Sequence, residues 1–288
     1  PPHIGRGMEI FDARIWYENI WCDDVMWGYE IEVSISNSHQ FHFAEPGSTL
    51  NSHIEKNNQT ATSKVKTERE IERLTHNGRI SAEAINRAIV ATAPGKFEYE
   101  LEAEATYWLV KNGFQAAAYP AIVGSGPNGN QWHYENNGRR MKENELVVMD
   151  YGGALDYLTI DITRTWPISG IFTETQEKAY RCVLDAQKAM IQAIRPGVTH
   201  KEIQSIGERV YESHGFSENK STAFIGHYVG MSVHDVGNWG LPFEAGMVIA
   251  LEPLLDLPDD QIHVRIEDTI LITKNGSKVL TSAAPKEI

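Results

Sequence analysis

The amino-acid sequence predicts an α+β protein whose main part consists of two related halves. Stretches with apolar residues at helical spacing alternate with short runs rich in valine and isoleucine, which are typical of buried strands. One set of motifs also occurs twice along the chain. With 288 residues, 41% of them hydrophobic, the chain is long enough to bury a sizeable core in one large domain or two smaller ones.

The first 63 residues differ in composition from the rest of the chain. Polar and apolar residues alternate over Tyr29–Ile35, which predicts one strand, and the polar run Asn51–Lys64 predicts a linker or long loop. We therefore divide the chain into a short N-terminal segment, residues 1–63, which could be the remnant of a larger domain, and a main domain, residues 64–288.

Four helices and four strands are expected in the main domain. The first helix begins after Lys66, where Thr67 can act as the N-cap, and it ends before Pro94-Gly95. The other helices are predicted over Glu98–Asn112, Glu174–Ile194 and Thr199–His214. The strands are predicted over Leu146–Asp150, Leu158–Thr163, Met247–Leu251 and His263–Thr273, and Asn275-Gly276 predicts a tight hairpin.

The repeat has a constant offset of 102 residues. Pro94-Gly95 recurs as Pro196-Gly197, and Gly113-Phe114 at the end of one helix recurs as Gly215-Phe216. The same shift carries Asp150 onto Glu252, each at the end of an apolar strand.

A two-fold repeat brings equivalent strands together, so Asp150 and Glu252 should face one another. Two buried carboxylates cannot both stay ionised without a cation between them. The repeat therefore predicts a metal site between the halves.

Three further residues have types and positions that suit metal binding. Asp161 follows Asp150 by eleven residues, His227 precedes His234 by seven, and Glu267 follows an apolar strand. Any one of these side chains alone would more often be structural, such as a turn cap or a satisfied core histidine. An acid inside an apolar strand, however, is costly to bury without a partner.

Composition excludes several classes of partner. The chain has 26 basic and 39 acidic residues, a formal net charge of −13, which argues against nucleic acid and acidic lipid surfaces. No run of about 20 apolar residues is present that could span a membrane. Two cysteines favour a reducing compartment, so a cytoplasmic location is expected, although a removed presequence would leave no trace in a chain beginning Pro1-Pro2.

The ordered set of Asp150, Asp161, His227, Glu252 and Glu267 resembles the pita-bread metallopeptidases. This family includes methionine aminopeptidase, prolidase, aminopeptidase P and the non-peptidase creatinase, and the resemblance covers about residues 64–288. It implies two pseudo-symmetric halves around a curved antiparallel sheet. It also implies that these five residues bind two divalent metal ions, with manganese expected first and cobalt, zinc or iron as alternatives.

Smaller motifs look most like aminopeptidase P. They are the segments 161–167, 227–230, 233–237 and 265–268. His133, seventeen residues before Asp150, matches a histidine that lines the substrate pocket in that group. The resemblance implies an Xaa-Pro aminopeptidase in which His133 and His234 contact the peptide and assist catalysis, Glu252 takes a proton from water, and Arg265 helps to bind substrate.

The chain also departs from this pattern at two places. Ala223 stands where aminopeptidase P commonly has another histidine. After Glu252-Pro253 the family usually continues with a glycine and then a tyrosine, and this chain has Leu254, Leu255 and Asp256 there. Two other functions therefore stay open, an Xaa-Pro dipeptidase (prolidase) and a catalytically silent domain that binds peptides. The expected partner is a peptide with proline second, and assembly into a homodimer or a higher homo-oligomer is left open.

Overall fold

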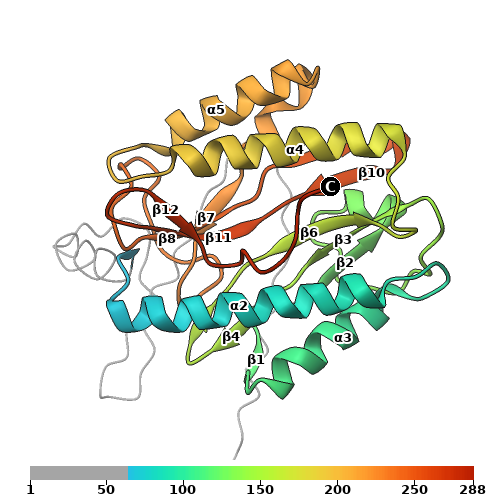
Figure 1. Cartoon of the computed structure of the whole chain (residues 1–288), viewed down its shortest axis with the longest axis horizontal. Helices are drawn as coiled ribbons and strands as arrows, with labels where there is room; N and C mark the ends of the chain where they lie inside the picture. Colours follow the sequence, from blue (N-terminus) through green and yellow to red (C-terminus); the bar gives the residue numbers. More distant parts are fainter. Residues whose placement is uncertain (1–63) are drawn as a thin grey trace, which may run out of the picture. The chain divides into compact units, whose positions relative to one another are not determined.

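The computed structural model describes residues 64–288, so the predictions for residues 1–63 lie outside the described residues. In Figure 1 the strands lie between two helix pairs, α2 with α3 and α4 with α5. The helices are α2 (Glu68–Ala91), α3 (Glu98–Lys111), α4 (Glu174–Ala193) and α5 (His200–Ser213). All four predicted helices are confirmed. Within this part of the chain, no helix combines the length and apolar character that crossing a membrane requires.

Three of these helices begin with a capping box. In each box a threonine side chain accepts a hydrogen bond from the backbone three residues on, and the side chain of that residue bonds back to the threonine N–H. The pairs are Thr67 with Glu70, Thr173 with Gln176 and Thr199 with Glu202. The N-cap expected at Thr67 is thus confirmed.

The two halves repeat one antiparallel strand order. In the first half β3 pairs with β2 and β6, and in the second half β8 pairs with β7 and β11. The first sheet contains β2 (Ile122–Ser125), β3 (Leu146–Asp150) and β6 (Thr163–Pro167). The second contains β7 (Gly226–Tyr228), β8 (Val248–Leu251), β11 (Asp268–Ile272) and the edge strand β12 (Ser277–Val279), which closes the predicted hairpin.

Two smaller pairings flank these sheets. One joins β1 (Ala116–Ala117), β4 (Gly153–Leu155) and β5 (Leu158–Thr159), and the other joins β9 (Leu254–Leu257) to β10 (Ile262–Arg265).

Backbone conformation confirms the repeat seen in the sequence. Gly95 and Gly197 have φ of 89° and 88°, and Gly113 and Gly215, which follow the C-caps of α3 and α5, have φ of 85° and 83°. These are left-handed conformations that glycine adopts without steric cost. Each half therefore turns at the same places for the same physical reason.

Two predicted strands are wrong as single elements. The run Leu158–Thr163 is broken between β5 and β6, and the run His263–Thr273 is broken between β10 and β11. The breaks fall at Asp161 and Glu267, where the chain passes from one sheet to another. Apolar residues continue through both breaks because the chain stays buried there, so hydrophobicity alone gives no signal of the interruption.

The strands separate two apolar cores. In β8, Val248 and Ala250 pack into the core beneath α2 and α3, and Ile249 and Leu251 pack into the core beneath α4 and α5. Successive side chains of a strand point to opposite faces, so a continuous apolar run serves both cores. The carboxylates at the strand ends are therefore held between two packed layers.

Candidate metal centre

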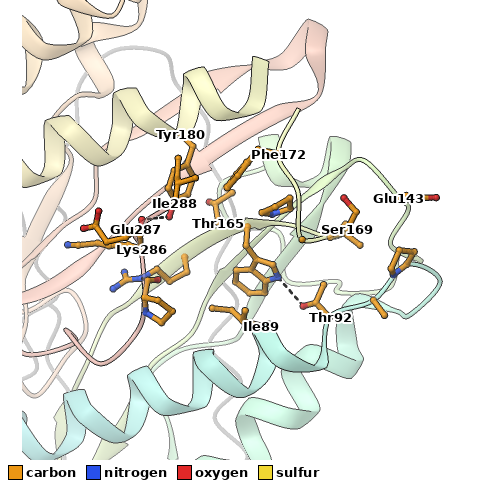
Figure 2. A pocket seen from close by; sticks show the side chains of 18 residues that line it. Ile89, Thr92, Glu143, Thr165, Ser169, Phe172, Tyr180, Lys286, Glu287 and Ile288 are labelled. Carbon is orange, nitrogen blue, oxygen red and sulfur yellow. Dashed lines mark hydrogen bonds between the residues drawn. The ribbon is translucent and has the colours of Figure 1, made fainter. Parts of the chain in front are cut away.

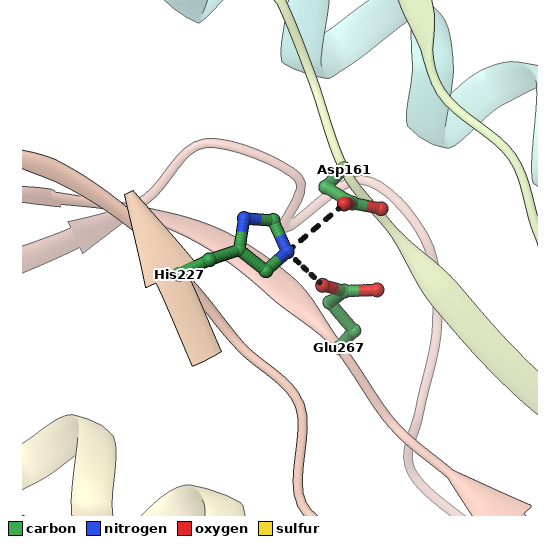
Figure 3. Close-up of side chains that lie close together, drawn as sticks. All are labelled: Asp161, His227 and Glu267. Atoms are coloured by element: carbon green, nitrogen blue, oxygen red, sulfur yellow. Dashed lines mark ion pairs between the residues drawn. The ribbon is translucent and has the colours of Figure 1, made fainter. Parts of the chain in front are cut away.

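Acidic side chains from both halves converge on His227 of β7. Its Nε2 lies 3.2 Å from Asp161 Oδ2, 3.5 Å from Glu252 Oε1 and 3.8 Å from Glu267 Oε1. One potential ligand atom each from Asp161, His227 and Glu267 lie within 4.8 Å of one another, and Figure 3 shows the three side chains pointing toward a common centre.

Asp150 lies beside this cluster and is tied to it by Tyr119. The Tyr119 hydroxyl donates to Asp150 Oδ1 at 2.6 Å and also lies within hydrogen-bond distance of Asp161 Oδ1. Arg265 Nη2 donates to Asp150 Oδ2 at 2.8 Å. A hydroxyl has one proton, so one of the two carboxyl groups must itself be protonated for both tyrosine contacts to be hydrogen bonds.

Glu267 has one oxygen in place and one without a partner. Thr163 Oγ1 donates to Glu267 Oε2 at 2.7 Å, but Glu267 Oε1 is buried and has no hydrogen-bond partner among the described residues. A buried carboxylate oxygen without a donor is costly. Because this oxygen faces His227, a divalent cation would satisfy it, and a donor set of carboxylates and imidazole suits such a cation.

The electrostatics of the site show that it lacks positive charge. Burial, with the charge of Asp161, raises the pKa of Asp150 to about 8 despite the nearby Arg265. Burial and the neighbouring acids raise the pKa of Glu267 well above its usual range. Burial opposes protonation of His227, but the hydrogen bond and charge of Asp161 outweigh it and raise the pKa of His227 to about 9. The raised pKa values mean that these groups hold protons, whose positive charge offsets the buried carboxylates as a bound cation would.

The two strand breaks create this geometry. Asp161 leaves the strand pattern, and its backbone N–H and C=O both bond to the Thr269 hydroxyl of β11, at 3.0 and 2.7 Å. The N–H of Glu267 likewise donates to the Thr163 carbonyl of β6. Each carboxylate is therefore held by the opposite half of the repeat, which fixes the distance between them.

The predicted substrate residues lie around the cluster. The ring of His234 lies 4.2 Å, centroid to centroid, from that of His227. Burial and then the charge of His227 lower the pKa of His234 despite the charge of Asp161. His133 directly follows Trp132, whose carbonyl accepts a hydrogen bond from Arg265 Nη1. Arg265 is buried, with 3% of its side chain exposed, and holds Asp150.

Ala223 is fully buried in the core beneath α4 and α5, beside Gly207. The sequence reasoning missed Tyr119, Thr163 and Thr269, whose contacts depend on segments far apart in the chain.

A cavity in the described part of the chain lies away from this cluster. It has a volume of about 660 Å³ and is lined by Thr92, Phe172, Tyr180 and Lys286 among others (Figure 2). None of the predicted site residues lines it. The cluster around His227 is thus identified by its chemistry and not by the size of a cavity.

The chain is similar in sequence to Xaa-Pro aminopeptidases and Xaa-Pro dipeptidases. An Xaa-Pro aminopeptidase from Haemophilus influenzae is 32% identical over 262 residues, covering 78% of this chain and 59% of its own length. An Xaa-Pro dipeptidase from Pyrococcus horikoshii is 37% identical over 221 residues, covering 75% of this chain and 62% of its own. The chain therefore spans less than two thirds of the length of these relatives.

Solved structures and a family model agree with each other. Aminopeptidase P from Escherichia coli superimposes with a TM-score of 0.73 at 32% identity, covering 78% of this chain and 58% of that one. The likeness confirms the predicted pita-bread fold. Residues 72–274 match the model of metallopeptidase family M24. The fold, the cluster of potential ligands and this match together show that the chain belongs to metallopeptidase family M24.

Proposed function

We propose that this protein is a metal-dependent aminopeptidase that releases the first residue from peptides with proline second. The observation that carries the proposal is the unpartnered Glu267 oxygen facing His227 and Asp161 in a chain of family M24. Two divalent ions would be held by Asp150, Asp161, His227, Glu252 and Glu267.

The residues of the site suit peptide hydrolysis. Bound divalent cations lower the pKa of water and polarise a carbonyl group. Burial, the largest influence, raises the pKa of Glu252 above its usual range, which makes this carboxylate a better proton acceptor. His234 has a lowered pKa and is therefore neutral at pH 7, so it can donate a hydrogen bond to the peptide and accept one elsewhere. His133 contacts the peptide from the neighbouring loop.

Three finer points belong to the same proposal. Manganese is the preferred ion because the ligands are oxygens and an imidazole without thiolate, and cobalt, zinc and iron are the alternatives. Burial raises the pKa of the Cys182 thiol to about 12, and such an unreactive free cysteine suits a reducing compartment such as the cytoplasm. Assembly into a homo-oligomer remains a prediction.

An Xaa-Pro dipeptidase is the second candidate, because the Pyrococcus horikoshii relative that carries this name is 37% identical. A dipeptidase must hold the free carboxylate of a short substrate close to the proline. Arg265 lies near the cluster, but its guanidinium is already bonded to Asp150 and to the Trp132 carbonyl. This favours the aminopeptidase.

A competition experiment separates these functions. The manganese-loaded protein is incubated with an equimolar mixture of an Xaa-Pro-Yaa tripeptide, an Xaa-Pro dipeptide and a Met-Ala-Yaa tripeptide, and the products are identified by mass spectrometry. Asp161→Ala removes a proposed ligand, and Asp259→Ala removes an exposed acid outside the site as the matched control.

We expect selective release of the first residue from the Xaa-Pro-Yaa peptide, abolished only by Asp161→Ala. Selective cleavage of the dipeptide would make the protein a prolidase. Binding of the peptides without cleavage of any of them would identify a silent peptide-binding domain and refute the proposal.

A further inference from the structure

A carboxylate–imidazole pair lies at one edge of the candidate site. Asp256 of β9 and His263 of β10 are opposite each other in the antiparallel pairing, and His263 Nδ1 donates to Asp256 Oδ1 at 2.7 Å. His263 is 2% exposed, and the side chain of Asp256 is 27% exposed.

Asp256 also holds the segment before His133. Trp132 Nε1 donates to Asp256 Oδ2 at 2.8 Å, and Asn130 Nδ2 donates to Asp256 Oδ1 at 3.0 Å. Asp256 thus accepts hydrogen bonds on both oxygens, which fixes the carboxylate plane and with it the indole. Trp132 as a whole is 40% exposed, so part of a large aromatic side chain lies at the surface in a set orientation.

The backbone of Trp132 connects this pair to the metal cluster. Its carbonyl accepts from Arg265 Nη1 at 3.3 Å, and Arg265 Nη2 donates to Asp150 at 2.8 Å. The next residue along the chain is His133. Trp132 is therefore anchored at both ends, by its carbonyl toward the metal cluster and by its indole to Asp256.

The protonation states suit an anchor. Burial raises the pKa of Asp256, but the hydrogen bonds from His263, Trp132 and Asn130 outweigh burial and lower it, so the carboxylate is ionised at neutral pH. Burial lowers the pKa of His263, which is therefore neutral and donates from Nδ1. Its Nε2 is buried without a hydrogen-bond partner in the described residues. A buried polar atom without a partner lowers the free energy of unfolding, so this nitrogen does not stabilise the fold. We therefore assign to His263 the role of orienting Asp256 through Nδ1.

We propose that Asp256 and His263 form a clamp that sets the Trp132 indole as the apolar wall against which the proline ring of the substrate packs. The inference rests on the proposed function and names specificity-determining and positioning residues for it. Proline has no N–H to offer, so recognition of its ring depends on shape and apolar contact. An aromatic face held by its N–H supplies such a contact at little entropic cost, because the ring is already immobilised.

A double-mutant cycle tests the clamp on the full chain loaded with manganese. Trp132→Phe removes the indole N–H, Asp256→Ala removes its acceptor, and Asp259→Ala is the matched control on the neighbouring exposed loop. We expect each of the first two variants to raise KM for an Xaa-Pro-Yaa peptide about 5- to 10-fold with kcat changed less than about 2-fold. The double variant should show less than the sum of the two single effects, because both single variants remove the hydrogen bond from the Trp132 indole to Asp256.

His263 gives a graded test of positioning. His263→Leu should raise KM like Asp256→Ala, whereas His263→Asn should restore most of the wild-type KM, because an asparagine amide can donate from near the Nδ1 position. Additive effects in the cycle, or equal KM for the leucine and asparagine variants, would overturn the clamp.

A spectroscopic measurement makes the test independent of catalysis. For this measurement the protein is labelled with ¹⁵N-tryptophan and loaded with zinc, which is diamagnetic and does not broaden nearby signals, and the indole signal that Trp132→Phe removes is assigned to Trp132. Asp256→Ala should move this signal upfield and Asp259→Ala should leave it in place. If the wild type cleaves no peptide, the proposed function fails, and titration of the same signal with the Xaa-Pro-Yaa peptide gives a Kd. An unchanged signal, or an unchanged Kd in Asp256→Ala, would then refute the inference by itself.

Discussion

The two halves of the repeat differ in how fully the oxygens of their buried carboxylates are hydrogen-bonded by the protein. In the first half, Asp150 accepts hydrogen bonds from Tyr119 and Arg265. In the second half, Glu267 accepts one from Thr163 on one oxygen, and its other oxygen has no partner among the described residues. In the first half, both oxygens of Asp150 thus accept hydrogen bonds from the protein, whereas in the second half one oxygen of Glu267 has no such donor among the described residues.

This difference shows how a duplicated scaffold can specialise. A carboxylate paired with a buried arginine is fixed in place before metal arrives, whereas an unpaired buried carboxylate stores unfavourable free energy that a cation releases on binding. We infer that the first half positions the site and that the second half supplies much of its affinity for metal.

Removing one ligand from each half gives the largest expected effect. Asp150→Ala and Glu267→Gln should each lower peptidase activity by about 100-fold or more, because both residues are proposed ligands. Their effects on the metal-free protein should differ. Asp150→Ala leaves buried Arg265 without the acceptor of its 2.8 Å hydrogen bond and should destabilise the metal-free fold by about 3 kcal/mol, whereas Glu267→Gln should change it little.

Urea unfolding of chelator-treated protein, with metal content measured in parallel, checks this contrast. Equal losses of metal-free stability in the two variants would show that Asp150 and Glu267 contribute equally to the metal-free fold, and that the proposed difference between the halves is wrong.

The loops that carry His133 and His234, the two histidines proposed to contact substrate, are held by Glu98 and His200, which are 102 residues apart in the repeat and make different numbers of hydrogen bonds. Glu98 at the start of α3 is fully buried and accepts hydrogen bonds from the Ser125 N–H and hydroxyl and from the Arg139 N–H, on either side of His133. His200, 102 residues later at the start of α5, makes one hydrogen bond to the Trp239 carbonyl in the loop after His234.

Glu98→Ala should therefore destabilise the protein by about 3 kcal/mol, because it leaves several buried donors without an acceptor. His200→Ala removes one hydrogen bond and should cost about 1 kcal/mol. Urea titrations of both variants under one condition measure the difference, and a larger loss for His200→Ala would reverse the assignment of the stronger anchor.

The protons held by the metal-free site predict a pH dependence of metal binding. Asp150 has a folded pKa of about 8 against an ordinary value of 3.8, so the metal-free fold loses stability as pH rises from about 4 to 8. His227, with a folded pKa of about 9 against 6.5, acts in the same direction between those values. Metal must displace these protons, so its apparent affinity should rise about 10-fold per pH unit for each proton displaced.

Manganese titrations followed by the rise in Tm at pH 6, 7 and 8 give this slope. An affinity independent of pH would mean that Asp150 and His227 hold no protons that metal must displace.

The sequence allowed the helices and the repeat to be predicted, because these depend on local periodicity and on a recurring offset, whereas the grouping of the acids with His227 was implied by the resemblance to a known family. It did not reveal the breaks at Asp161 and Glu267, since the surrounding residues are apolar and buried on both sides. It also did not reveal Tyr119, which lies 31 residues from Asp150 and 42 from Asp161 and contacts both only after β3 and β6 have paired. The proposed ligands could be anticipated from their own strands, but the groups that hold them could not.

The smallest expected effect compares the helices that open the two halves. Thr67 caps α2 with Glu70 as its partner, and Thr173 caps α4 with Gln176. Replacing either threonine by alanine should cost about 1 kcal/mol at pH 7.

Burial raises the pKa of Glu70, but hydrogen bonds from Thr67 outweigh burial and lower it below 4.5. Its contribution is therefore present above that value and is lost as pH falls through the lower folded pKa. Glutamine does not titrate, so the cost of Thr67→Ala should shrink on acidification to pH 3, whereas that of Thr173→Ala should not. Urea titrations of both variants and the wild type at pH 7 and pH 3 measure these costs, and equal shrinkage in both would show that the charge of Glu70 contributes nothing to its box.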